Sequence, residues 1–101
     1  MDLSRSEDAG LVERARRGDP AAVDALFRRH WPAAWRRAFA VTGRRAPADD
    51  IAQEAIVNAL GRLDALDDPA AFGPWLARSV TRRAIDLLRR ESRDVGLEDA
   101  A

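Results

Sequence analysis

Residues 74–92 read PWLARSVTRRAIDLLRRES, and this stretch decides the fold. An α-helix turns by about 100° per residue, so apolar residues spaced three and four apart fall on one arc of the helix. That arc, which must pack against other helices, is formed by Leu76, Val80, Ala84, Leu87 and Leu88. All six arginines lie on one side, outside that arc: Arg78, Arg82, Arg83, Arg89, Arg90 and Arg93. We therefore predict an amphipathic helix that starts at Gly73 and Pro74 and ends near Ser92.

Residues 19–43 predict a second long helix. Asp19 can cap its first turn, and Pro20 can occupy the first position, where a missing N–H costs nothing. Gly43 can end it in the left-handed conformation that glycine adopts easily. Pro32 lies inside the stretch, and we expect it to kink or briefly break the helix near residues 28 and 29. The apolar stripe is rich in aromatic residues and consists of Val23, Leu26, Phe27, Trp31, Trp35, Ala38, Phe39 and Val41.

A third helix is predicted from Pro47. Asp49 and Asp50 would lie in its first turn, where the helix dipole favours negative charge. Its buried face is predicted to consist of Ile51, Ala55, Ile56, Ala59, Leu60 and Leu63. Residues 64–73 follow, and we expect an ordered loop with one turn at residues 69–72.

Strand signals are nearly absent, because the sequence has few β-branched residues and no sustained two-residue alternation. A short first helix is predicted over residues 11–18, with Ser6 and Asp8 as candidate N-caps. The expected fold is all-α, a compact bundle of about four helices formed by residues 1–93. Residues 94–101 are expected to be a flexible tail or the start of an interdomain linker.

The formal net charge of the 101 residues is zero, but the charges are sorted along the chain. Residues 28–45 hold six arginines and no acid, residues 46–73 hold six acids and one arginine, and residues 74–93 hold six arginines and two acids. Such blocks indicate two separate partner surfaces of opposite polarity, one of them for an anionic polymer, although a solvated surface of mixed charge would also fit.

The composition narrows the function classes. There is no cysteine, which excludes a disulfide framework and a thiolate metal site. The sequence has no apolar run of membrane-spanning length and no secretory signal at its start, so we expect a cytoplasmic protein without membrane contact.

Trp75 projects into the arginine side of the last predicted helix. An aromatic ring among arginines combines base stacking with phosphate attraction, which is what single-stranded nucleic acid binding requires. The alternative is that Trp75 folds back and covers the preceding loop, since tryptophans are usually largely buried.

The third predicted helix carries a polar stripe on its outer side, formed by Asp50, Gln53, Glu54 and Asn58. It suits a basic protein partner, or it is simply a solvated helix face. A magnesium site at Asp49, Asp50 and Glu54 is a weaker alternative, because facing carboxylates and a phosphate-binding loop are lacking. His30 has no partner for nucleophilic or zinc chemistry, so we expect it on the helix surface, and we expect a protein that is not an enzyme and has no cofactor.

Three stretches together resemble region 2 of extracytoplasmic-function sigma factors. They are LVERARRGDPAAVDALFRRH, ADDIAQEAIVNAL and PWLARSVTRRAIDLLRR, and the likeness covers residues 11–93. The DDIAQEA core is fairly specific, and the final stretch after a short acidic loop makes the combination strong.

The resemblance implies a fold of the sigma region 2 type and two partners. The polar stripe, that is Asp50, Gln53, Glu54 and Asn58, would dock on the clamp helices of the RNA polymerase β′ subunit. The last helix and its preceding loop would bind promoter DNA, namely the non-template single strand of the minus-ten element. The implied DNA contacts are Asp67, Asp68, Phe72 and Trp75 together with Arg78, Arg82, Arg83, Arg89 and Arg90.

Two departures leave a second function open. Arg82 stands where the family often has a short polar residue, and no helix-turn-helix follows Ser92. The acidic tail GLEDAA resembles the start of an interdomain linker, which favours a trimmed piece of a longer protein over a single-domain factor. The alternative function is a monomeric interaction module that binds polymerase or an anti-sigma factor without engaging DNA.

Overall fold

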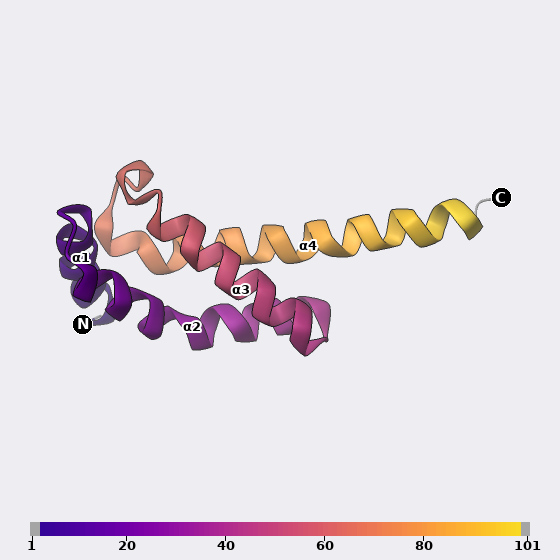
Figure 1. The fold of residues 1–101 in the computed structure, drawn as a ribbon, viewed down its shortest axis with the longest axis horizontal. Coiled ribbons are helices and arrows are strands. Elements are labelled where there is room, and N and C mark those ends of the chain that lie inside the picture. The colour runs from indigo at the N-terminus through magenta and orange to yellow at the C-terminus, as the bar shows by residue number, and fades with distance from the viewer. Residues whose placement is uncertain (1–2, 100–101) are drawn as a thin grey trace.

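The computed structural model describes residues 3–99, with side chains described from residue 3 to residue 95 (Figure 1). Within this range the backbone forms four α-helices and two short 3-10 helices, so the predicted all-α fold is confirmed. The α-helices are α1 (Leu3–Arg16), α2 (Pro20–Thr42), α3 (Arg45–Leu60) and α4 (Phe72–Asp99). The 3-10 helices η1 (Leu63–Ala65) and η2 (Pro69–Ala71) lie between α3 and α4.

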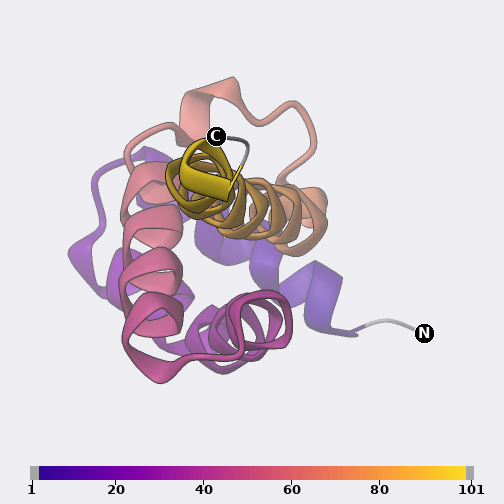
Figure 2. The same ribbon diagram turned by 90° about the vertical axis from the view of Figure 1, so that its right-hand side faces the viewer.

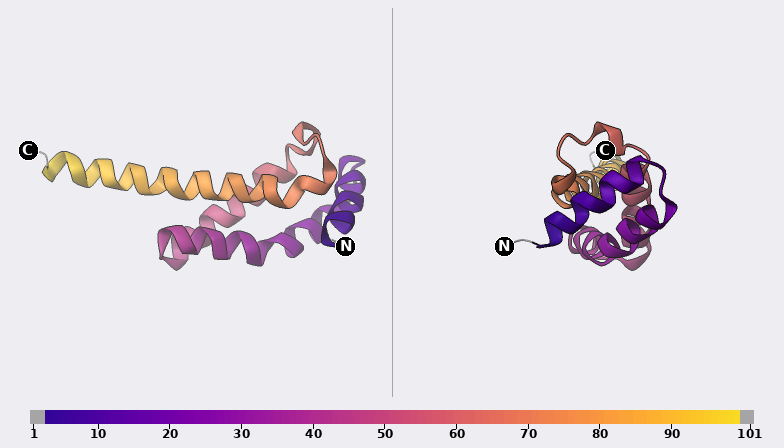
Figure 3. Two further views of the ribbon diagram at one scale, coloured as in Figure 1. Left: turned by 180° about the vertical axis from the view of Figure 1, so that it is seen from behind. Right: turned by 90° about the vertical axis from the view of Figure 1, so that its left-hand side faces the viewer.

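Helices α2, α3 and the first half of α4 pack side by side, and α1 lies across the end at which α4 begins (Figures 1 and 3). Viewed along α4, helices α2 and α3 lie next to one another beside it (Figure 2). The second half of α4 extends past the other helices, which makes the molecule elongated, at 54 × 23 × 22 Å. None of the helices described is long and apolar enough to span a bilayer.

Alanines let the helices approach closely. The buried faces of α2 and α3 include Ala22, Ala34, Ala38, Ala48, Ala52, Ala55 and Ala59. The larger side chains that fill the remaining space are Phe72, Leu26, Ile56, Val12 and Val80, all fully buried. Of the apolar arc predicted for α4, Leu76, Val80 and Ala84 are buried, while Leu87 and Leu88 near the middle of the helix are only partly buried.

Both ends of α2 form as predicted. The Asp19 carboxylate accepts a hydrogen bond from the Ala21 backbone N–H at 3.0 Å, and Pro20 follows at the first helical position. A hydrogen bond from Arg14 lowers the pKa of the Asp19 carboxyl. Gly43 ends the helix with a φ of 69°, which is the left-handed region. The helix is not broken near residues 28 and 29, where Pro32 was predicted to cause a kink or a brief break, and α2 is one helix from residue 20 to residue 42.

Helices α3 and α4 have boundaries that differ from the prediction. Helix α3 begins at Arg45, so Pro47 lies within the first turn, and Asp49 and Asp50 follow it in the second. Helix α4 already begins at Phe72, and it continues to Asp99. The tail predicted from residue 94 is therefore helical as far as the structure describes it.

The first helix is longer than predicted, and the reason is a buried charge. Helix α1 begins at Leu3, so neither Ser6 nor Asp8 is an N-cap. Asp8 is only 5% exposed, and its Oδ1 accepts hydrogen bonds from Arg29 Nε at 2.8 Å and from His30 Nε2 at 2.9 Å. These contacts join α1 to α2, and they need the helix to extend back past Asp8 so that Glu7 can also reach Arg29 at 2.7 Å.

His30 is not a surface residue, and that prediction was wrong. Its side chain is 14% exposed, and its ring meets the Phe72 ring edge-on at a centroid distance of 4.9 Å.

Burial alone would lower the pKa of Arg29, but the hydrogen bonds of its guanidinium group with Asp8 and Glu7 outweigh burial and raise that pKa. The cluster of Asp8, Arg29 and His30 thus links α1 and α2 to the start of α4.

We predict that Asp8→Ala lowers the free energy of unfolding by about 2 to 3 kcal/mol, because hydrogen bonds to a buried charged group are lost. Glu7→Ala is the matched control, since it removes an exposed carboxylate from the same guanidinium group and should cost at most about 1 kcal/mol. Urea unfolding followed by circular dichroism measures both. Equal losses in the two variants would contradict the assigned role of Asp8.

Candidate nucleic-acid interface

The arginines of α4 are mostly free of acidic partners. Among residues 3–95, where side chains are described, Arg83 is the one arginine of α4 in an ion pair, with Glu54 on α3 at 3.6 Å. Arg78, Arg82 and Arg89 have no ion pair within that range. Their guanidinium groups are therefore not locked into internal pairs, and they are available to an anionic ligand.

Trp75 combines the two predicted alternatives, which were exposure among the arginines of the helix and burial over the preceding loop. The residue is partly buried, and its ring centroid is 6.2 Å from that of Phe72, so it does pack on the core. It also lines a small hollow between the end of α3 and the first half of α4, together with Asn58, Ala59, Arg62, Arg78, Ser79 and Arg82. We name this the Trp75 hollow.

The Trp75 hollow has a volume of about 140 Å³ and no carboxylate among the residues that line it. At roughly 30 Å³ for each water molecule, it would hold about five waters, which is the scale of one planar ring system. Three arginines, one aromatic ring and two neutral polar side chains surround it. This combination suits an anionic ligand that carries a flat group.

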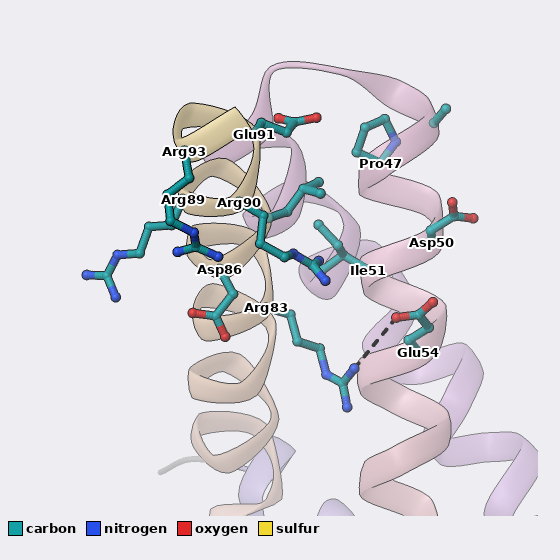
Figure 4. A pocket seen from close by; sticks show the side chains of 12 residues that line it. Pro47, Asp50, Ile51, Glu54, Arg83, Asp86, Arg89, Arg90, Glu91 and Arg93 are labelled. Atoms are coloured by element: carbon teal, nitrogen blue, oxygen red, sulfur yellow. Dashed lines mark ion pairs between the residues drawn. The ribbon is translucent and has the colours of Figure 1, made fainter. Parts of the chain in front are cut away.

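The second half of α4 is different, because acids and arginines alternate there. A groove of about 780 Å³ runs between the first half of α3 and the second half of α4 (Figure 4). Its apolar residues are Ala46, Pro47, Ile51 and Leu87. Its charged lining consists of Asp50, Glu54, Asp86 and Glu91 with Arg83, Arg89, Arg90 and Arg93. We name this the mixed-charge groove.

The mixed-charge groove corrects the prediction of two separate faces. Asp50 and Glu54, expected on a surface of their own, lie across the groove from Arg83, Arg89 and Arg90, and Figure 4 shows the ion pair that joins Glu54 to Arg83. The sequence correctly predicts which side of each helix is exposed, but not that the polar sides of α3 and α4 adjoin.

The predicted polar stripe of α3 is fully exposed, yet its members face different neighbours. Gln53 lies toward α2, where it adjoins a hollow lined by Phe27, Trp31 and Pro32. Asn58 turns toward α4 and lines the Trp75 hollow. Val57, an apolar residue that the predicted stripe did not include, is exposed between them at 56%.

The arrangement of the acids does not favour the magnesium alternative. Asp49 lies on the α2 side of α3, where it accepts a hydrogen bond from the Trp35 indole N–H. Within the described part of the chain, no group of three or more histidine, aspartate or glutamate side chains is placed to hold a metal ion.

The loop between α3 and α4 is held in place by its own buried side chains and by hydrogen bonds from α1. Leu63, Leu66 and Phe72 are at most 5% exposed. The Arg16 guanidinium group donates to the Leu63 carbonyl at 3.0 and 3.2 Å and also to the Leu66 carbonyl. The sequence gives no local signal for this clamp, because the partners are 47 and 50 residues apart.

The loop residues predicted to contact DNA divide into two groups. Asp67 and Asp68 are exposed, and the Asp68 carboxylate caps η2 by accepting from the Ala70 N–H at 3.0 Å. Phe72 is 0% exposed, so its ring belongs to the core and has no surface to offer a base. Phe72 is therefore not a candidate DNA contact. Its aromatic side chain, at the start of α4, fills space between α1, α2 and the loop.

We predict that Arg16→Gln speeds amide hydrogen exchange at Ala65 and Leu66, because the hydrogen bonds it removes, each to a charged group, contribute about 1.5 to 3 kcal/mol. Arg17→Gln, at the neighbouring exposed arginine, is the control. Exchange in α2 should be unchanged in both variants. If the control accelerates exchange in the loop as much as Arg16→Gln, the clamp is not what orders the loop.

Comparison with known proteins identifies the class of domain. The family model described as Sigma-70 region 2 matches residues 26–94. Among the relatives, the ECF RNA polymerase sigma factor SigM of Mycobacterium tuberculosis is 36% identical over 83 residues, covering 82% of this chain and 42% of its own length. SigW of Bacillus subtilis, another ECF sigma factor, is 28% identical over 87 residues, covering 86% and 46%. The RNA polymerase sigma-H factor of Pseudomonas aeruginosa is 32% identical over 103 residues, covering 97% and 53%.

The chain belongs to the sigma-70 region 2 family, as its helical bundle and its motifs predicted. It spans about half the length of the relatives it matches. No solved structure matches it. The family match begins at residue 26, so α1, with Asp8 and Arg16, lies before the matched part.

Proposed function

We propose that the chain acts in transcription initiation as the region 2 domain of a sigma factor of the extracytoplasmic-function type. In this proposal α3 binds RNA polymerase through its exposed side, and the first half of α4 with its preceding loop holds the non-template strand of the minus-ten element. The family match and the names of the relatives, which are RNA polymerase sigma factors, support the general role.

The observation that carries the DNA part is the Trp75 hollow. A melted strand offers phosphates on one side and flat bases on the other, so its binding site needs cations and an aromatic face together. Trp75 supplies the face, and Arg78 and Arg82 supply cations that no neighbouring carboxylate neutralises. Unstacking one base costs a few kcal/mol, which stacking and edge hydrogen bonds in the hollow would offset.

The exposed loop acids fit base recognition better than phosphate contact. Asp67 and Asp68 would repel a phosphate, but a carboxylate accepts hydrogen bonds from the exocyclic amino group of cytosine. Because Arg16 and three buried side chains already hold the loop, little further ordering would be needed when a base binds.

The polymerase part rests on the outer side of α3. Asp50, Gln53 and Glu54 are exposed along its length, and an acidic stripe suits a basic surface on the partner. Val57 adds an exposed apolar side chain at the centre of this surface, where a protein partner would bury it. Asn58, which lines the Trp75 hollow, would contact DNA instead.

The proposal is tested by fluorescence anisotropy with a labelled minus-ten oligonucleotide. We predict that Trp75→Leu, which keeps apolar packing but removes the aromatic face, weakens binding by about 1 to 3 kcal/mol. Trp31→Leu is the matched control, because Trp31 is a partly buried tryptophan in a hollow between α2 and Gln53 of α3, and it does not line the Trp75 hollow. Equal loss in both variants would mean that the effect comes from stability rather than from stacking.

We predict that the double change Gln53→Ala and Glu54→Ala weakens binding to core polymerase at least tenfold, or by about 1.4 kcal/mol, while oligonucleotide affinity changes little. Titration of labelled chain with core enzyme measures the first affinity. Glu13→Ala, an exposed acid on α1, controls for the lost charge. Equal weakening of both affinities would indicate misfolding or a wrong assignment of the surface.

A second candidate is the interaction module that does not engage DNA. The mixed-charge groove supports it, because four acids, four arginines and an apolar floor suit a protein segment such as that of an anti-sigma factor. Oligonucleotide binding at low salt separates the two candidates. If the chain does not bind the oligonucleotide there, the interaction module is the better description.

A further inference from the structure

Helix α2 carries arginines for which the proposed function gives no role. Residues 28–45 include six arginines, and three of these are paired with acids. Arg28 pairs with Asp24, Arg29 with Asp8 and Glu7, and Arg44 with Glu91. Arg36 and Arg37 are exposed and have no ion pair within the part of the chain whose side chains are described.

Arg36 and Arg37 line a groove of about 730 Å³ between α2 and the start of α4. The opposite wall is formed by Gly73, Pro74 and Ala77, and most of the remaining lining residues are alanines. Within residues 3–95, no carboxylate lines the groove. Arg37 also donates to the Thr81 hydroxyl at 3.2 Å, which joins α2 to α4 across it. Because the side chains that form the walls are small and the arginines are unpaired, an anionic chain can approach the protein backbone closely.

This groove connects to the Trp75 hollow. A neighbouring hollow of about 510 Å³ shares Arg37, Pro74 and Ala77 with the groove, and it adds Arg78, Thr81 and Arg82. Arg78 and Arg82 in turn line the Trp75 hollow. The three spaces therefore follow one another around the first half of α4, from the α2 side to the α3 side, and no acid among the described residues lines any of them.

We propose that these three connected spaces carry the sugar–phosphate backbone of one DNA strand, with Arg36 and Arg37 of α2 as phosphate contacts. The inference rests on the proposed function, since it continues the strand whose base stacks on Trp75. Charge selects this occupant: an apolar or basic protein segment would require apolar or acidic side chains in the lining, whereas a continuous lining of arginines matches an extended polyanion, which carries a phosphate at every residue. The mixed-charge groove, with its four acids, lacks this property.

The test measures the salt dependence of oligonucleotide affinity in the 101-residue chain, with a minus-ten strand extended at both ends. Each phosphate contact on a single strand contributes about −0.7 to the slope of log affinity against log salt, so Arg36→Gln with Arg37→Gln should make the slope less negative by about 1.4. Between roughly 50 and 200 mM salt, the double variant should lose about sevenfold less affinity than the unaltered chain.

Two further variants make the result specific. Arg28→Gln with Arg45→Gln removes the same charge, but Arg28 lies on the opposite flank of α2, beside Gln53, and Arg45 begins α3. This control should keep the original slope. Arg36→Lys with Arg37→Lys should also keep it, because lysine still neutralises a phosphate as a point charge.

The outcomes are distinct. If the unaltered chain binds but Arg36→Gln with Arg37→Gln behaves like the control pair, the path along α2 is wrong and the proposed function stands. A lysine variant that loses as much as the glutamine variant would also overturn the path, because the effect would not come from charge. If the unaltered chain does not bind the strand even at low salt, the proposed function fails and the path fails with it.

Discussion

The burial of one face of α4 is the constraint on which the candidate site depends. Leu76, Val80 and Ala84 are at most 3% exposed, and each large apolar side chain contributes about 1.5 to 3 kcal/mol when it is fully buried. A rotation of α4 about its axis by one residue would put either Trp75, Ser79 and Arg83 or Ala77, Thr81 and Ile85 in their places, so a polar side chain would face the core in both cases. The packing therefore fixes which way Arg78 and Arg82 point, and it holds Trp75 at the boundary between core and surface.

The start of α4 depends in turn on α1 and α2. Phe72 fills the space beside His30, and His30 is held by Asp8, which also binds Arg29. An added Cβ at Gly73 would lie 3.6 Å from the His30 ring, so the first turn of α4 passes close to this cluster. A buried ion pair is weak evidence for net stability, but its geometric demands make it a good positioning device. Here it fixes the point at which the loop ends and the arginine-bearing helix begins.

Sequence reasoning succeeded where the determinants are local. Asp19 and Gly43 mark the ends of α2 because capping acts within a few residues, and the buried faces of α3 and α4 follow from helical periodicity. It failed where a side chain finds its partner across the fold. Asp8 looks like an N-cap in sequence, because nothing nearby reveals that Arg29 and His30 will surround it.

The same reason explains what was missed in the candidate site. Arg16 binds carbonyls that are 47 and 50 positions away in the sequence, and Glu54 and Arg83 are 29 positions apart. Only the packing of the helices brings these residues together. Phe72 was assigned to DNA because its loop resembles the loop that captures a flipped base in the family, whereas its side chain is fully buried. The proposed role of Arg36 and Arg37 also depends on which helix α2 lies beside.

Charge sorting in space explains how a chain of zero net charge can offer a site to a polyanion. Charges more than about 10 Å apart are largely screened at 0.1 M salt, so the local balance matters more than the total. Around the first half of α4 that balance is positive, and it ends at Asp86, one helical turn beyond Arg82. Past this residue, carboxylates from α3 and α4 line the same groove as the remaining arginines. The arginines of α4, which lie between residues 78 and 93, therefore have two electrostatic surroundings, and the acids beside them, rather than the arginines themselves, define the boundary.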